Sequence, residues 1–389
     1  MENIDIKHIL KAHAYKNIPL NYDEAYELAD YAIAGCEGNN LAQIQSTAAL
    51  CALHTKATYG YLKYNHEWHT HRLPKNAAEQ IAGLCAAVFE KDIARSEFGF
   101  LHPRVPYALD NCGMGGDLVV TANVSTISAL IAAAGNVPML KHGSPSNADG
   151  GRHGSSDFIS LCGIDTMASK ADIEKCLETH RFGYTEALDV RYKKIHLQTH
   201  EFALLPHMND ILGPITNPLN PQLLTRRVLG VNHLIPPRIL AETYLILNKK
   251  KITNMQNALF IRGFVGNQGI DELSICKEGT LVAELSNGKI FEYTLNAEDF
   301  GLKPISHASV SPPKNMSKGE FSLKILSGEI TGPPLQMVLS NVALLFYLTE
   351  ASDDLKECYE IAEQIQSSGK AYQKMLDVRN AIPKMNHKS

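Results

Sequence analysis

The sequence predicts a protein of the α+β or α/β class, with an N-terminal helical domain and an α/β domain built on a mostly parallel central sheet. Segments before residue 105 have helical periodicity and helix-start signals, whereas short apolar segments alternate with helical ones after it. A chain of 389 residues, 44% of them hydrophobic, can bury the cores of two domains. We therefore expect a helical domain over residues 1–104 and an α/β domain over residues 105–389.

The overall charge excludes no partner by itself but favours none that is strongly anionic. With 37 Lys and Arg against 41 Asp and Glu, the net charge is −4, so nucleic acid and anionic membranes exert no general attraction. The N-terminal segment has no continuous apolar stretch of the signal-peptide type, and no run approaches 18 apolar residues. We expect a cytoplasmic protein that does not enter a membrane.

The cysteine pattern points in the same direction. The eight cysteines are scattered without CxxC spacing, which argues against a zinc site and against a disulfide framework. We expect reduced thiols, several of them in the core.

Three amphipathic helices are predicted in the N-terminal domain. Asn21 and Glu24 form a capping-box pattern that begins the first helix, and Gly35 is placed to end it. Asn40 precedes the second helical segment. Asn76 and Glu79 repeat the capping-box pattern at the start of the third. This region should therefore pack as a small helical domain.

A polar and aromatic segment at 60–75 separates the last two of these helices. It contains His66, His69 and His71, whose spacing admits a metal site. No carboxylate or thiol pattern supports such a site, so an exposed loop is the simpler interpretation. The role of this insertion stays open.

The alternating pattern after residue 105 gives the expected elements of the α/β domain. We predict helices at 124–135 and 155–163, a strand followed by a loop at 137–143, and two C-terminal helices at 333–350 and 354–376. Further strands are predicted at 228–231, 257–264, 271–275 and 281–285.

The sequence GMGGD at 113–117 followed by NVST at 123–126 is the first candidate functional motif. A glycine-rich turn exposes backbone N–H groups, and the helix start that follows adds unpaired donors with positive dipole character. Together they can hold phosphate oxygens. A tight turn followed by an ordinary helix cap is the structural alternative.

Two further motifs fit the same site. The sequence LKHG at 140–143 is expected to place a lysine and a histidine on a loop after the next strand, where ligands bind in open α/β folds. Asp271 and Glu272 stand side by side between a glycine turn and a predicted strand. Such a pair is usually a solvated surface feature, but in this setting each carboxylate can take a Mg²⁺ ion.

With these motifs, the sequence resembles the anthranilate phosphoribosyltransferases, relatives of the class III nucleoside phosphorylases. The segment 21–58 resembles the helical dimerisation segment of that family. The later motifs follow in the family order: GMGGD (113–117), NVST (123–126), LKHG (140–143), GSSDFISLCGI (154–164), ILGPITNP (211–218), GIDELS (269–274), and ILSGEITGPP to SSGKAYQKML (325–376). The resemblance implies binding of phosphoribosyl diphosphate (PRPP) and a homodimer.

The resemblance also implies roles for individual residues. The residues implied to bind PRPP are Gly113, Gly115, Gly116, Asp117, Asn123, Ser125, Thr126 and Lys141. Those implied to hold Mg²⁺ are Ser125, Asp271 and Glu272, and the implied catalytic set is Lys141, Asp271 and Glu272. Loss of pyrophosphate leaves an oxocarbenium-like ribose, so catalysis needs charge stabilisation on the leaving group and a positioned acceptor.

The sequence departs from the family pattern mainly where the acceptor would bind. Met114 replaces a threonine, Ser144 replaces an asparagine, and Arg152 is a candidate for restoring the missing positive charge. The family's VRR motif, whose arginine contacts the anthranilate carboxylate, falls by spacing on residues 199–201, THE. The acceptor-binding candidates are His142, Ser144, Arg191 and His200, with Lys193 and Lys194 as further cations.

These observations predict a Mg²⁺-dependent transferase that moves the phosphoribosyl group of PRPP to an aromatic amine, with anthranilate as the best acceptor. Its active site is expected at the hinge between the two domains, and its dimer interface at the N-terminal helices. Three alternatives remain: a different acceptor, phosphorolysis of a nucleoside, and a non-catalytic relative that binds nucleic acid or protein. The acidic balance and the surviving motif residues weigh against nucleic acid.

Overall fold

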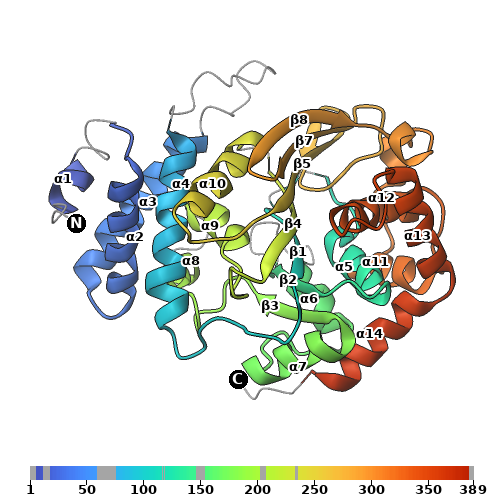
Figure 1. Ribbon diagram of the computed structural model, residues 1–389, viewed down its shortest axis with the longest axis horizontal. Coiled ribbons are helices and arrows are strands. Elements are labelled where there is room, and N and C mark those ends of the chain that lie inside the picture. Colours follow the sequence, from blue (N-terminus) through green and yellow to red (C-terminus); the bar gives the residue numbers. More distant parts are fainter. Residues whose placement is uncertain are drawn as a thin grey trace. The chain divides into compact units, whose positions relative to one another are not determined.

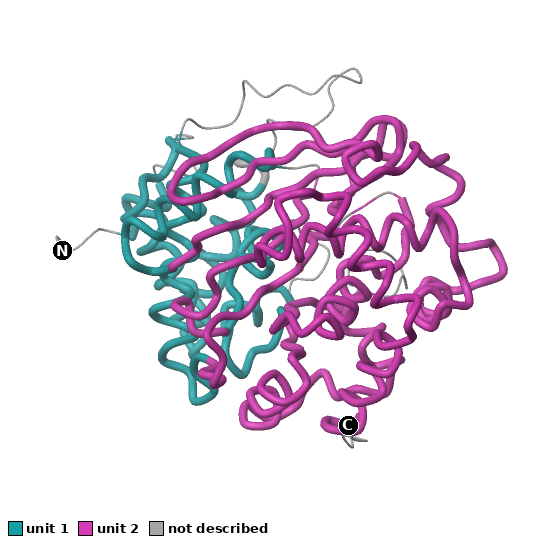
Figure 2. Tube along the Cα trace, turned by 45° about the vertical axis from the view of Figure 1, so that its right-hand side comes forward, with its two compact units in different colours: residues 1–100, 187–218, 233–253 teal, residues 101–186, 219–232, 254–389 magenta. Residues whose placement is uncertain are grey.

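The chain forms two compact units, coloured separately in Figure 2. The computed structural model describes residues 6–11, 18–58, 76–115, 117, 119–145, 154–201, 207–232 and 235–384. Unit 1 comprises residues 1–100, 187–218 and 233–253, and unit 2 comprises residues 101–186, 219–232 and 254–389. Unit 1 thus takes two segments from the stretch after residue 105 in addition to the N-terminal helices.

Unit 1 is helical (Figure 1). Its α-helices are α1 (Ile6–Leu10), α2 (Tyr22–Cys36), α3 (Asn40–Thr58), α4 (Ala77–Ala87), α8 (Leu197–Glu201), α9 (Asn209–Ile215) and α10 (Pro237–Lys249). Helix α2 packs against both α3 and α4, and α4 also packs against α10. The three predicted N-terminal helices are present as α2, α3 and α4.

The capping box predicted for the first of these helices is confirmed. The Asn21 side chain accepts a hydrogen bond from the Glu24 N–H at 2.9 Å, and the Glu24 carboxylate accepts one from the Asn21 N–H at 2.9 Å. The prediction that Gly35 ends the helix is wrong, because Gly35 lies inside α2. A Cβ there would lie 2.6 Å from the Gln43 nitrogen, so this glycine permits the close approach of α3.

The capping box predicted at Asn76 is also wrong. The Asn76 side chain makes no cap hydrogen bond to α4. Its amide donates to the Leu20 carbonyl at 2.5 Å, and its oxygen accepts from the Gln80 side chain at 3.2 Å. The Asn76 side chain therefore binds Leu20, 56 residues away in sequence, instead of capping α4.

Unit 2 contains one mixed sheet. Its strands are β1 (Ala108–Gly113), β2 (Met139–Gly143), β3 (Phe182–Glu186), β4 (Leu224–Gly230), β5 (Asn257–Val265), β6 (Gln268–Ile270), β7 (Thr280–Ser286) and β8 (Lys289–Leu295). The strand order is β3-β2-β1-β4-β5-β7-β8, and β6 pairs with β5. Strands β1 to β5 run parallel, whereas β6, β7 and β8 add antiparallel pairs at one edge. The predicted mostly parallel sheet is confirmed.

Helices cover this sheet in layers (Figure 1). Helix α5 (Val124–Ala134) packs against β1 and β2, α12 (Pro333–Leu348) packs against β4 and β5, and α13 (Leu355–Ser367) and α14 (Lys370–Ala381) pack on these two. The remaining α-helices are α6 (Ser155–Leu161), α7 (Lys170–His180) and α11 (Lys318–Ser327). The predicted second C-terminal helix is interrupted at Gly369, whose φ is +75°. Among the described helices, none has the length and apolar character needed to cross a membrane.

A buried ion pair joins β1 to β4, and a hydrogen bond to the same carboxylate adds β2. Asp110 on β1 and Arg227 on β4 are register partners, and their carboxylate and guanidinium lie 2.5 Å apart with both side chains wholly inaccessible to solvent. Asp110 also accepts a hydrogen bond at 3.0 Å from the N–H of His142 on β2. Removal of either charge would leave the other buried and uncompensated.

Three glycines, at the last residues of β1 and β4 and within β5, admit the segment that follows β6. A Cβ on Gly230 would lie 1.5 Å from the Asp271 carbonyl oxygen, and one on Gly113 would lie 2.2 Å from the Asp271 carboxylate. A Cβ on Gly263 would lie 2.2 Å from the Glu272 carbonyl oxygen. The predicted strand at 271–275 is wrong, because this segment is a turn pressed against β1, β4 and β5.

Two histidines are buried inside unit 1. His54 on α3 lies 3.7 Å from the Asp210 carboxylate, and His207 contacts Gln198 at 3.0 Å. Burial lowers the pKa of His54 to about 4, and burial together with the charge of His54 lowers the pKa of His207 to about 4. Burial also raises the pKa of Asp210, so this carboxylate does not offset the cost of charging His54.

We expect unit 1 to lose stability in mild acid. The unfolded histidines take up protons near pH 6.5 and the folded ones only near pH 4, so stability is complete above pH 6.5 and falls as the pH decreases toward 4. Each histidine should cost about 2 kcal/mol at pH 5. Urea unfolding at pH 7 and pH 5 measures this. His54→Gln should reduce the difference and the exposed control His102→Gln should not; equal pH dependence in both variants would contradict the account.

Alanine at position 230 should destabilise unit 2. The new Cβ overlaps the Asp271 carbonyl, which is backbone and cannot rotate away, so we expect Gly230→Ala to cost about 3 kcal/mol. Gly115→Ala is the control, because φ there is +74° but no atom lies within 4 Å of the new Cβ. That variant should lose only about 1 kcal/mol. Thermal unfolding compares the two, and equal melting temperatures would rule out the proposed close contact.

Candidate functional site

The candidate site lies at the carboxyl ends of the parallel strands. From β1 the chain continues to β2 and β3 on one side of the sheet and then to β4 and β5 on the other. The order therefore reverses at β1, and the loops after β1 and β4 leave in opposite directions. In open α/β sheets, ligands bind in the crevice at this point.

The start of α5 presents polar groups that the described protein does not use. Asn123 precedes the helix, and its backbone N–H donates to the Ser322 hydroxyl at 2.8 Å. The Asn123 side-chain amide and the Thr126 hydroxyl are buried, and neither has a hydrogen-bond partner among the described residues. Ser125 between them is half-exposed. Buried polar groups are normally paired, so these two are suited to a ligand that supplies the missing oxygens.

The glycine loop runs from the end of β1 to α5 and contacts the carboxylate segment. The Met114 N–H donates to the Gly230 carbonyl at 3.0 Å, which continues the pairing of β1 with β4. The Gly115 N–H donates to the Asp271 carboxylate at 2.5 Å. A Cβ on Gly115 would have no described atom within 4 Å, apart from its neighbours in the chain, so this part of the loop is open. Gly116 lies outside the described residues.

Three carboxylates gather beside this loop. The Asp271 N–H donates to the Asp117 carboxylate at 3.1 and 3.2 Å, and the Thr121 hydroxyl donates to the Glu272 carboxylate at 2.8 Å. Burial and the charge of Asp271 raise the pKa of Glu272 to about 8, partly offset by Lys318 and Lys141. Burial and Asp271 likewise raise the pKa of Asp117. A bound cation would therefore favour the ionised forms of Glu272 and Asp117.

The donor set fits Mg²⁺ bound together with a phosphate ligand rather than a closed protein cage. In the parts of the chain that the structure describes, no three His, Cys, Asp or Glu side chains converge as a complete metal site would. Mg²⁺ is usually held by one or two carboxylates, with substrate phosphates and water completing the octahedron. Asp271 and Glu272 would supply the carboxylates. The three histidines at 66, 69 and 71 lie outside the described residues.

The LKHG segment lies within strand β2 rather than on the predicted loop. Lys141 is inaccessible to solvent, and its ammonium donates to the His142 carbonyl at 2.7 Å. Lys141 is nevertheless close enough to the carboxylates to lower the pKa of Glu272. His142 is also buried, and its ring lies 2.8 Å from the Thr185 hydroxyl on β3. All five residues of β2 are buried, so Lys141 and His142 belong to the interior of the sheet and not to an exposed loop.

The remaining acceptor candidates belong to both units. Ser144 follows β2 in unit 2, and its carbonyl accepts from the Ser156 N–H at 3.2 Å. Arg191 in unit 1 pairs with Asp189 at 2.7 Å and lies over the Phe98 ring at 5.2 Å. Arg152 and the side chain of His200 lie outside the described residues.

The two further cations considered for the acceptor, Lys193 and Lys194, have partners within unit 1. The Lys193 ammonium is buried and donates to the carbonyls of Gly213 and Thr216 at 3.2 and 3.1 Å. Lys194 pairs with Glu37 at 2.8 Å.

Three residues that position the site are not among those predicted from the sequence. The Thr121 hydroxyl donates to Glu272, and the Ser322 hydroxyl on α11 accepts from the Asn123 backbone. The Asn341 side chain on α12 accepts from the Leu273 N–H and donates to the Leu273 carbonyl, both at 3.0 Å. Thr121 could have been recognised from its place beside NVST. Ser322 and Asn341 lie 199 and 68 residues from their partners and carry no local signal.

Comparison with known proteins agrees with this geometry. Residues 105–372 match the family described as "Glycosyl transferase family, a/b domain". The anthranilate phosphoribosyltransferase of Pseudoalteromonas translucida is 30% identical over 367 residues, which cover 94% of this chain and 90% of the relative.

Solved structures share the fold over nearly the whole chain. The anthranilate phosphoribosyltransferase of Saccharomyces cerevisiae superimposes with TM-scores of 0.73 in complex with 4-fluoroanthranilate and 0.72 in complex with PRPP and Mg, at 20% identity and 97% coverage of each chain. The match over residues 105–372 and the identity over most of the relative's length settle the family. This chain is a member of the anthranilate phosphoribosyltransferase family, within the glycosyl transferase family with an a/b domain.

Proposed function

We propose that this protein is a Mg²⁺-dependent phosphoribosyltransferase that transfers the phosphoribosyl group of PRPP to anthranilate and releases pyrophosphate. One observation carries the proposal. The Asn123 amide and the Thr126 hydroxyl, which have no hydrogen-bond partner among the described residues, stand at the start of α5. The loop that leads into this helix holds Asp271 through the Gly115 N–H and Glu272 through the Thr121 hydroxyl. One loop thus links donors for a diphosphate to carboxylates for its metal.

The roles of the individual residues follow from their chemistry. Asn123, Ser125 and Thr126, with the backbone of Gly113 and Gly116, bind the diphosphate, while the Gly115 N–H and the Asp117 carboxylate orient the Asp271 segment. Asp271, Glu272 and Ser125 would hold Mg²⁺, which would neutralise the charge of the pyrophosphate. Lys141 adds positive charge from within β2. This arrangement stabilises the leaving group and involves no covalent bond to the protein.

Relatives support the named substrates. The yeast enzyme of this family binds PRPP with Mg, and it also binds 4-fluoroanthranilate. His142, Ser144, Arg191 and His200 are the proposed contacts for the acceptor. We further propose a cytoplasmic homodimer formed through the N-terminal helices, on the resemblance of residues 21–58 to the dimerisation segment of the family and on the scattered cysteines, which are expected to be reduced thiols.

Removal of the paired carboxylates should abolish turnover. In Asp271→Asn/Glu272→Gln the side chains keep their size but lose the charge that holds the metal, so pyrophosphate release from PRPP and anthranilate should fall roughly 100-fold or more. The control Glu360→Gln/Glu363→Gln removes two exposed carboxylates of α13 and should retain full activity. A wild-type protein without Mg²⁺-dependent pyrophosphate release would reject the proposed function. An active double variant would reject the assigned metal ligands.

A further inference from the structure

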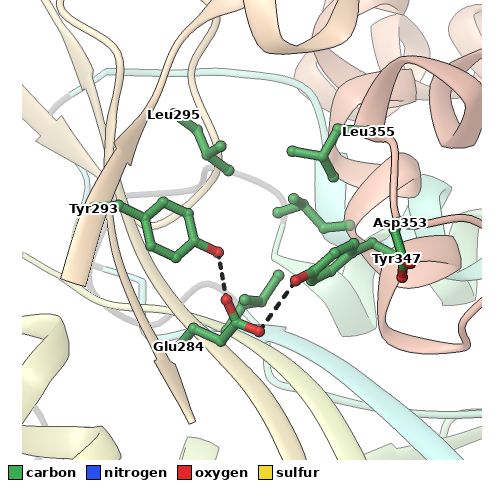
Figure 3. A pocket seen from close by; sticks show the side chains of 8 residues that line it. Glu284, Tyr293, Leu295, Tyr347, Asp353 and Leu355 are labelled. Carbon is green, nitrogen blue, oxygen red and sulfur yellow. Dashed lines mark hydrogen bonds between the residues drawn. The ribbon is translucent and has the colours of Figure 1, made fainter. Parts of the chain in front are cut away.

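A cavity apart from the candidate site lies in unit 2 between the β7–β8 hairpin and helix α12 (Figure 3). Its volume is about 280 Å³, and its lining residues are Leu259, Glu284, Tyr293, Leu295, Leu344, Tyr347, Asp353 and Leu355. None of them belongs to the candidate transferase site. The proposed reaction therefore gives no account of this cavity.

The sheet register brings the polar part of the cavity together. Glu284 on β7 is the register partner of Leu259 on β5 and of Phe291 on β8. Tyr293 stands two residues beyond Phe291, so it lies diagonally across from Glu284 on the same face of the sheet. Tyr347 reaches the same point from α12.

Both tyrosines donate to one carboxylate. The Tyr293 hydroxyl donates to Oε2 of Glu284 at 2.8 Å, and the Tyr347 hydroxyl donates to Oε1 at 3.2 Å, as the dashed lines in Figure 3 mark. Burial and the charge of Glu284 raise the pKa of Tyr347 to about 12 and raise that of Tyr293 further. Both phenols therefore remain protonated and commit their only hydrogen to Glu284, which leaves their oxygens as acceptors.

The polar side chains of the lining consequently present acceptors to an occupant. Glu284 and Asp353 are carboxylates, and the two phenolic oxygens have no further hydrogen to donate. Among the described residues, the lining includes no basic or amide side chain. A primary ammonium group is the complement of this wall, because it carries a positive charge and three donors but no acceptor.

The other walls select the rest of the ligand. Four leucines supply apolar surface, and the tyrosine rings can also face a cation. Pockets for drug-sized ligands measure about 300–1,000 Å³, so this cavity suits a smaller molecule. We propose that the cavity binds a small primary amine with an apolar body, an alkylamine or arylalkylamine in its protonated form.

Titration calorimetry of the full chain with 2-phenylethylamine tests the class of ligand. Phenylalanine adds a carboxylate to the same body, and 2-phenylethanol replaces the ammonium with a hydroxyl. We expect saturable binding of the amine and at least tenfold weaker binding of both analogues. The acceptor groups of the cavity repel the carboxylate of phenylalanine, and the neutral hydroxyl of 2-phenylethanol lacks the positive charge that they attract. Absence of amine binding, or equal binding of the three compounds, would overturn the proposal.

Variants test the location. Glu284→Gln should weaken binding of 2-phenylethylamine at least tenfold, and Asp353→Asn should weaken it about threefold, while Glu360→Gln on the exposed surface of α13 should leave it unchanged. Asp353 is exposed, so this variant reports on the cavity even if Glu284→Gln fails to fold. Circular dichroism checks the fold of each. Unchanged affinity in the folded cavity variants would place the amine elsewhere.

Discussion

The absence of side chains at three glycines of the parallel strands is the constraint on which the candidate site depends. Gly230 and Gly263 leave room for the backbone of residues 271–272 on β4 and β5, and Gly113 leaves room for the Asp271 carboxylate on β1. Any Cβ at Gly230 would overlap this segment, and the carboxylates would then move away from the loop after β1. The parallel sheet determines where the strand ends are, and the glycines decide how closely the acidic turn approaches them.

From this contact the electrostatics of the site follow. Three carboxylates are held together at the buried end of the sheet, where their mutual repulsion and lost hydration raise the pKa values of Asp117 and Glu272. Hydrogen bonds from the Gly115 backbone and from Thr121 keep Asp271 and Glu272 in place despite this repulsion. Under the proposed function, a divalent cation and a phosphate bound together would offset this electrostatic cost, because the cation would neutralise the carboxylates and the phosphate would balance the remaining positive charge.

Much of this arrangement could be predicted from the sequence, and the failures share a physical cause. The helix over α5 and the mostly parallel sheet follow local patterns that the structure keeps. The predictions at Asn76 and at residues 271–275 are wrong because packing partners distant in sequence override the local pattern. At Gly35 the close approach of α3, and not the end of α2, requires the glycine. Ser322 and Asn341 could not be found at all, since only the folded chain brings α11 and α12 to the loop and the turn that they hold.

The most direct test of the account is a crystal structure of the protein soaked with PRPP and Mg²⁺. The account predicts diphosphate oxygens within hydrogen-bond distance of the Asn123 amide and the Thr126 hydroxyl, with metal bound to Asp271 or Glu272. These groups then acquire the partners that the described part of the chain does not give them. PRPP bound away from the start of α5, or bound there with both carboxylates remote from the metal, would contradict it.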